Sequence, residues 1–131
     1  MYQDTLIANS GGVNVGSDID DTYWATISYE QLIDYDPDLI VGAAGASYTV
    51  EDIKTDERLK SLSAIENDQV YIMPRNIERC DSPLPSAIIG NMWLTSVLHD
   101  EIYPFDKFQD EAYEFYKEFY EIEINKDEVG K

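Results

Sequence analysis

The sequence is poor in the residue types that build catalytic and metal centres. It contains one cysteine, Cys80, and one histidine, His99, in 131 residues. A single cysteine excludes an internal disulfide and a cysteine-rich metal site, and a single histidine argues against a zinc enzyme. Neither residue belongs to a recognisable nucleophile–base signature. We therefore expect a non-enzymatic protein with no metal site of its own and no cofactor.

Basic residues are also scarce. Nine lysines and arginines stand against 27 aspartates and glutamates, which gives a formal net charge of −18. Such a surface repels phosphate backbones and anionic headgroups, so nucleic acid is an unexpected partner. No apolar run approaches the roughly 20 residues of a membrane span. The first residues, 1–5, lack the basic and apolar regions of a signal peptide.

The stretch 28–42 encodes a helix, a stop and a strand. Ser28 and Gln31 have the spacing of a capping box, in which hydroxyl and amide each satisfy a backbone N–H. Pro37 ends the helix and pushes Asp36 out of the helical region. The apolar run 39–41 follows as a strand buried on both faces, as in a parallel sheet.

The rest of the chain continues this alternation. We expect helices at 5–10, 28–35, 50–54, 82–99 and 106–122, and strands at 13–15, 38–43 and 70–73. Thr49 is the expected cap of the third helix. Strands that alternate with helices predict an α/β layered domain.

Five ordered segments carry a family resemblance. They are ANSGGVNV (8–15), an aromatic at 24, IS.EQL…DPDLIV (27–41), LSAIENDQVYIMP (62–74) and SPLPSAIIGNMWLTSVLH (82–99). Together they resemble the C-terminal lobe of class III solute-binding proteins. These are the extracytoplasmic receptors of ABC importers for iron–siderophore, haem and cobalamin-type metal chelates.

The resemblance implies a fold and a division of the chain. The fold is a three-layer Rossmann-like lobe with a mostly parallel central sheet flanked by helices. Residues 1–124 would form the C-terminal lobe, with the N-terminal lobe absent, and 125–131 a frayed tail. The implied partners are an ABC permease and a small-molecule metal chelate, bound outside the cytoplasm. An extracytoplasmic sensor or interaction module that uses the same lobe is the alternative.

The resemblance also assigns a docking residue. Glu30 matches the position at which an acidic side chain of this lobe enters a basic pocket of the permease. The alternative is that Glu30 only complements the positive end of its helix, where a carboxylate contributes about 0.3–1 kcal/mol.

Ligand contacts are expected from aromatic and polar residues at the cleft edge. Trp24 and its neighbour Tyr23 would supply rigid contact area, although Trp24 packing on the core is an equal alternative. Ser47 and Tyr48 follow the first long strand, at the carboxyl end where α/β sheets bind ligands. Arg79 follows the second strand and would hold an anionic group, unless a local ion pair with Glu78 or Asp81 occupies it.

Only two strands are strongly predicted, whereas a sheet usually has about four to six. An unpaired strand edge is a template for pairing with another chain. We therefore expect self-association, with a homodimer formed through an exposed sheet edge.

Overall fold

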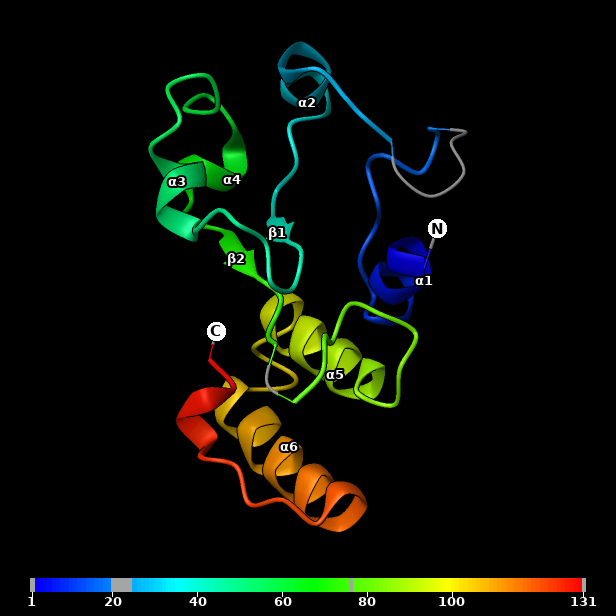
Figure 1. Cartoon of the computed structure of the whole chain (residues 1–131). Helices are drawn as coiled ribbons and strands as arrows, with labels where there is room; N and C mark the ends of the chain where they lie inside the picture. Colours follow the sequence, from blue (N-terminus) through cyan, green and yellow to red (C-terminus); the bar gives the residue numbers. More distant parts are fainter. Residues whose placement is uncertain (1, 20–24, 76, 131) are drawn as a thin grey trace.

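The computed structural model describes residues 2–19, 25–75 and 77–130. Pairs of helices alternate with single strands along the described chain (Figure 1). In order they are α1 (Tyr2–Asn9), α2 (Tyr29–Tyr35), β1 (Ile40–Gly42), α3 (Val50–Lys54), α4 (Ser63–Glu66), β2 (Val70–Ile72), α5 (Ala87–Leu98), α6 (Phe105–Tyr120) and the short 3-10 helix η1 (Lys126–Glu128).

The two strands form a parallel sheet, as the sequence predicts. Ile40 of β1 lies opposite Val70 of β2, and Gly42 lies opposite Ile72. The connection between the strands carries α3 and α4, and α3 packs against β2. This is the crossover connection that a parallel pair requires.

Helices cover both faces of the sheet. Leu39 and Val41 pack on the main buried cluster, which includes residues of α1 and α5. Ile40 points to the other face, where it borders a shallow hollow with Tyr29 of α2 and Ile53 of α3. The expected three-layer α/β lobe is therefore confirmed.

Hydrogen bonds at the helix ends explain the first half of the fold. Ser28 Oγ accepts the Gln31 N–H at 3.1 Å, but the Gln31 amide donates to Tyr35 at 3.0 Å instead of returning to Ser28. One half of the predicted capping box is therefore confirmed. Asp36 leaves the helix with φ 39°, and its carboxylate accepts the Ser63 N–H and hydroxyl, each at 2.8 Å. These bonds lower the pKa of Asp36.

The predicted cap of α3 is confirmed and complete. Thr49 Oγ1 accepts the Asp52 N–H at 3.1 Å, and Asp52 Oδ2 accepts the Thr49 N–H at 2.8 Å. Each side chain thus satisfies one of the backbone donors that a helix start leaves free.

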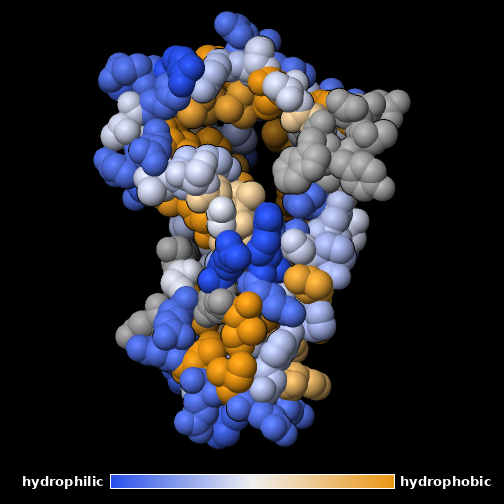
Figure 2. Space-filling model, in the orientation of Figure 1, coloured by the Kyte–Doolittle hydropathy of each residue, from blue (hydrophilic) through white to orange (hydrophobic). Residues whose placement is uncertain are grey.

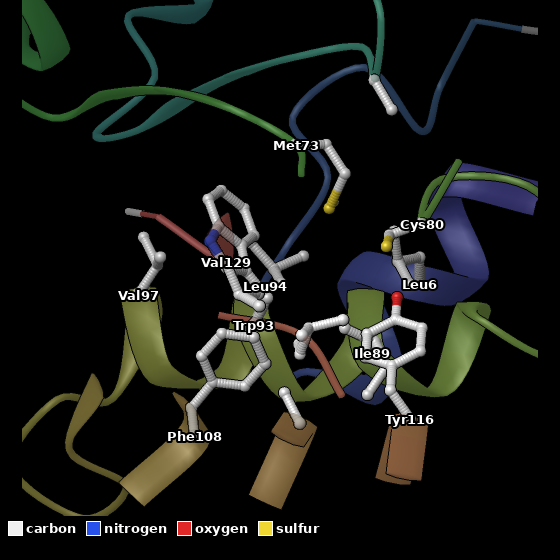
Figure 3. Packing of buried hydrophobic residues seen from close by; sticks show 13 residues of the cluster. Leu6, Met73, Cys80, Ile89, Trp93, Leu94, Val97, Phe108, Tyr116 and Val129 are labelled. Carbon is white, nitrogen blue, oxygen red and sulfur yellow. The ribbon is translucent and has the colours of Figure 1, made fainter. Parts of the chain in front are cut away.

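The core lies between α5 and α6. Trp93 of α5 and Phe108 and Tyr116 of α6 are fully buried. Figure 3 shows Trp93 and Phe108 side by side and the Tyr116 hydroxyl directed toward Cys80. The amphipathic pattern of α6 therefore sets the position of this layer.

Two predicted elements differ in the structure. The helix expected from Ser82 begins at Ala87, because Leu84 lies between two prolines and the residue before a proline avoids helical geometry. Segment 13–15 is not a strand. No described strand lies beside it to complete a ladder, and Val13 is 88% exposed.

The C-terminal tail is packed, so the expectation of a frayed segment 125–131 is wrong for the described residues up to 130. Val129 is fully buried in the main cluster. The Trp93 indole N–H donates to the Gly130 carbonyl at 3.1 Å, and the Gln109 amide donates to the Lys126 carbonyl at 3.0 Å. Burial of Val129 in the core and these two side-chain hydrogen bonds hold the segment in place, although most of its residues are polar or charged.

Candidate functional site

The loops that follow β1 and β2 meet at one edge of the sheet. The Ala44 N–H, just after β1, donates to Asp81 Oδ2 at 2.7 Å across 37 positions of sequence. The second loop is itself closed by an isolated antiparallel bridge between Arg75 and Arg79. Because parallel strands end together, their loops form the edge at which α/β sheets bind ligands.

Asp81 is the centre of this junction. Its side chain is 5% exposed, whereas that of Arg79 is 44% exposed. Arg79 donates from Nε to Oδ1 at 3.1 Å and from Nη2 to Oδ2 at 3.2 Å, which is a bidentate pair. The pair raises the pKa of Arg79. The Gln3 amide also donates to the Asp81 carbonyl at 3.3 Å, which ties α1 to the same point.

Arg79 is therefore held by Asp81, as the ion-pair alternative from the sequence states. Part of its guanidinium remains open to solvent. The sequence singled out Arg79 for ligand contact but did not single out Asp81 as the residue that joins the two loops. The bond to Ala44 spans too much sequence for a local pattern to indicate it.

Arg75 is a second cation at this edge, and it is not among the ligand contacts predicted from the sequence. Its guanidinium lies over Gly45, which has φ +74°, and a Cβ at Gly45 would lie 2.7 Å from Arg75 Nη1. Arg75 is exposed and directly follows Pro74, the residue that ends the β2 region. The position of Arg75 directly after a predicted strand could have indicated a ligand contact.

Ser47 and Tyr48 lie in the loop after β1, as predicted, and both are exposed. The Tyr48 ring packs over Gly42, since a Cβ there would meet Tyr48 Cε2 at 3.0 Å. Their loop also contains Gly45, which contacts Arg75. The structure thus places Ser47, Tyr48 and Arg79 on loops that touch one another.

The other predicted site residues are not part of this edge. Tyr23 and Trp24 lie outside the described residues. Glu30 lies in the first turn of α2 and is exposed. Its helix precedes the amino end of β1, whereas the loops described above follow the carboxyl ends (Figure 1).

The ionisable groups at this edge are two exposed arginines, one buried aspartate and one buried thiol. Within residues 2–19, 25–75 and 77–130, no three His, Cys, Asp or Glu side chains gather as a potential metal site. Cys80, beside Asp81, is fully buried, and burial raises the pKa of its thiol to about 11, so it is not a thiolate at neutral pH. The exposed guanidinium groups favour anionic partners.

An apolar cavity of about 490 Å³ lies beside β1, and Asp81 of the loop junction is among its lining residues. It is bordered by α1, by segment 12–15, by residues 37–43 and by α5. Figure 2 shows the molecule hollowed in its upper half, with hydrophobic residues at the border of the opening.

No helix in the described part of the chain is long and apolar enough to cross a membrane.

A three-layer α/β lobe whose strand-end loops form an exposed polar edge is the architecture of a ligand-binding domain. The family described as periplasmic binding protein matches residues 2–77, more than half of the sequence. The chain belongs to this family, as its ordered motifs predict.

Solved structures show the same fold. A periplasmic solute-binding protein from Veillonella parvula superposes with a TM-score of 0.84 at 23% identity, over 97% of this chain and 40% of its own. CeuE of Helicobacter pylori, solved as a Ni-His complex, gives 0.80 at 20% identity over 96% and 40%. Molybdate-bound MolA, the cognate binding protein of a Haemophilus influenzae ABC transporter, gives 0.79 at 20% identity over 95% and 38%.

The chain thus spans about 40% of the length of these structural neighbours. No curated protein matches it at a significant level.

Proposed function

We propose that this lobe forms one wall of the ligand cleft in the substrate-binding component of an ABC importer. The observation that carries the proposal is the junction at Asp81, which holds the loops after β1 and β2 together with two arginines exposed beside it. Family membership supports a binding role, and the family and its neighbours are binding proteins, so the proposed role is non-catalytic.

The proposed ligand is a metal chelate of the iron–siderophore, haem or cobalamin type that carries an anionic group such as a carboxylate or phosphate. Arg75 and the open part of Arg79 supply positive charge on a strongly acidic chain, and guanidinium groups match carboxylate and phosphate geometry. Tyr48 supplies aromatic contact area, with Trp24 and Tyr23 as further proposed contacts. Two neighbours, CeuE with Ni-His and MolA with molybdate, bind metal-containing ligands, which supports a ligand of this kind.

Titration of the 15N-labelled chain with a ferric catecholate siderophore, with haem and with cobalamin tests the ligand site. We expect weak binding, with amide shifts confined to residues 43–48 and 75–81, since a second lobe normally closes the cleft. Arg75→Ala should weaken these shifts, whereas Arg58→Ala, at the Asp56 pair away from this edge, should leave them unchanged. Shifts that avoid both loops for all three compounds would contradict the proposal.

Glu30 is the proposed contact with the permease, and the proposed location of the lobe is outside the cytoplasm. Glu30→Lys in a receptor that carries this lobe should reduce uptake but spare ligand binding. Glu118→Lys, an exposed glutamate on α6, is the matched control and should leave both unchanged. Loss of ligand binding in the Glu30 variant would show that the assignment is wrong.

A further inference from the structure

The loop after β2 carries two positive and two negative side chains. The cations are Arg75 and Arg79, and the anions are Glu78 and Asp81. Asp81 is paired with Arg79 through two hydrogen bonds of 3.1 and 3.2 Å. The positive charge that this loop offers to a ligand therefore depends on whether Glu78 pairs with Arg75.

Glu78 lies within side-chain reach of Arg75. An antiparallel bridge joins Arg75 to Arg79, and bridged residues have Cα atoms about 4.5–5.5 Å apart. Glu78 directly precedes Arg79, so its Cα lies about 3.8 Å from that of a bridged residue. Among the described residues, however, neither Glu78 nor Arg75 makes an ion pair.

Tyr120, the last residue of α6, holds the Glu78 carboxylate instead. Its hydroxyl donates to Glu78 Oε2 at 2.9 Å, across 42 positions of sequence. Burial and this bond raise the pKa of Tyr120, so the phenol remains a proton donor at neutral pH. The bond keeps the half-buried carboxylate at α6 and out of contact with the exposed Arg75.

The Tyr120 ring is itself fixed by its neighbours on α6. Its centroid lies 5.5 Å from that of Tyr116 and 6.1 Å from that of Phe115. Figure 3 shows the Tyr116 hydroxyl directed toward Cys80 of the same loop. Burial is the main cause of the raised pKa of Tyr116, and the charge of Glu78 adds to it. The end of α6 thus faces the loop with aromatic rings and places a fixed donor at Glu78.

We propose that Tyr120 is a positioning residue for the ligand site, because it sequesters Glu78 and so leaves Arg75 available to an anionic group of the ligand. This inference rests on the proposed function and adds to it the residue that sets the charge of the arginine loop. Tyr120 does not touch the ligand and acts only through Glu78. Without the phenol, Glu78 pairs with Arg75, and the four charges of the loop cancel in two pairs.

Tyr120→Phe tests this role, because it removes the hydroxyl and keeps the ring. NMR of the Arg75 side chain in the absence of any ligand reports the pairing directly. We expect hydrogen exchange at the Arg75 Nε–H to slow about two- to fivefold in the variant, as for an exposed ion pair of ordinary strength. Tyr103→Phe is the matched control, since it removes the bond from the Tyr103 hydroxyl to Glu111 Oε2 at 2.6 Å, and it should leave Arg75 unchanged.

Titration with inorganic pyrophosphate measures the consequence for anion binding. The Kd, taken from the amide shifts of residues 77–80 at low ionic strength, should rise about two- to fivefold in Tyr120→Phe. Glu78→Gln added to Tyr120→Phe should restore the original Kd, because no carboxylate is then left to compete for Arg75. A purely structural defect would not be rescued by this second substitution.

Three outcomes would overturn the proposal. They are unchanged exchange of the Arg75 Nε–H in Tyr120→Phe, a raised Kd that Glu78→Gln does not restore, and the absence of pyrophosphate shifts at 77–80 in the unsubstituted chain. The last outcome would show that Arg75 is not an available cation. Titration of the unsubstituted chain with the three metal chelates involves neither Tyr120 nor Glu78, so the ligand proposal stands or fails by a separate result.

Discussion

The part that holds α2 and α3 and the part that holds α5 and α6 are stabilised in different ways. Neither α2 nor α3 contains a buried residue, and their ends are fixed by short-range bonds such as the Thr49–Asp52 box. By contrast, α5 and α6 meet through fully buried Trp93, Phe108 and Tyr116.

The comparison shows that short-range contacts determine one part of the lobe, whereas contacts between residues far apart in the sequence determine the other. In the first part, residues three positions apart determine where a helix begins. In the second part, the determining contacts join residues far apart, as between Trp93 and Gly130. Mutations should therefore have modest effects in the first part and large effects in the second.

The largest effect is expected at Trp93. Trp93→Ala removes a fully buried aromatic and should lower the free energy of unfolding by about 3–5 kcal/mol. Urea denaturation measures the change. Phe119→Ala on α6 is the control: this side chain is 67% exposed, so we expect a change within about 0.5 kcal/mol. Equal effects at both sites would contradict the packing described here.

Asp81 lies between the two parts and should give an intermediate effect. Asp81→Ala leaves the Ala44 N–H without its acceptor and should cost about 1–3 kcal/mol of stability. Hydrogen exchange at the Ala44 amide should accelerate at the same time. Glu66→Ala, an exposed carboxylate on α4, should alter neither quantity. An unchanged Ala44 exchange rate would show that Asp81 does not hold the loops.

A smaller effect is expected at the cap of α3. Thr49→Ala removes the acceptor for the Asp52 N–H and should reduce stability by about 0.5–2 kcal/mol. Thermal unfolding monitored by circular dichroism measures it. Ser61→Ala, at a nearby exposed serine outside the helices, should have no comparable effect. A larger loss at Thr49 than at Trp93 would reverse the comparison.

The smallest effect concerns pH. Hydrogen bonds from the Arg58 side chain lower the pKa of Asp56 from 3.8 to about 2. The native state therefore prefers the ionised carboxylate, so this contribution to stability is present above pH 3.8 and is lost as the pH falls through about 2. Carbon-13 NMR of the Asp56 carboxyl should show this titration, and Arg58→Ala should return it toward 3.8.

Local features were predictable from the sequence. The Ser28 and Thr49 caps, the stop at Pro37 and the two parallel strands follow from short patterns, and each is present in the structure. The sequence also predicted that Ser47, Tyr48 and Arg79 lie on neighbouring loops, because parallel strands end at the same edge of the sheet.

Features that depend on distant residues were not predictable. The tail packs because Gly130 reaches Trp93 and Gln109 reaches Lys126. Asp81 joins two loops through Ala44, a contact across 37 positions. Segment 13–15 has strand-like residues, but no strand of the described residues lies beside it, and a strand exists only as part of a ladder. Sequence periodicity contains no information about such partners.

Trp93 offers a consequence of practical use. Its indole ring makes an edge contact with Tyr71 of β2 at 6.2 Å between ring centres and bonds to the Gly130 carbonyl at 3.1 Å. One fluorophore therefore touches the sheet, the helical layer and the chain terminus. Separation of any one of the three would admit water to the indole and shift its emission to longer wavelength. The emission wavelength of Trp93 therefore reports on the packing of the sheet, the helical layer and the C-terminal tail together.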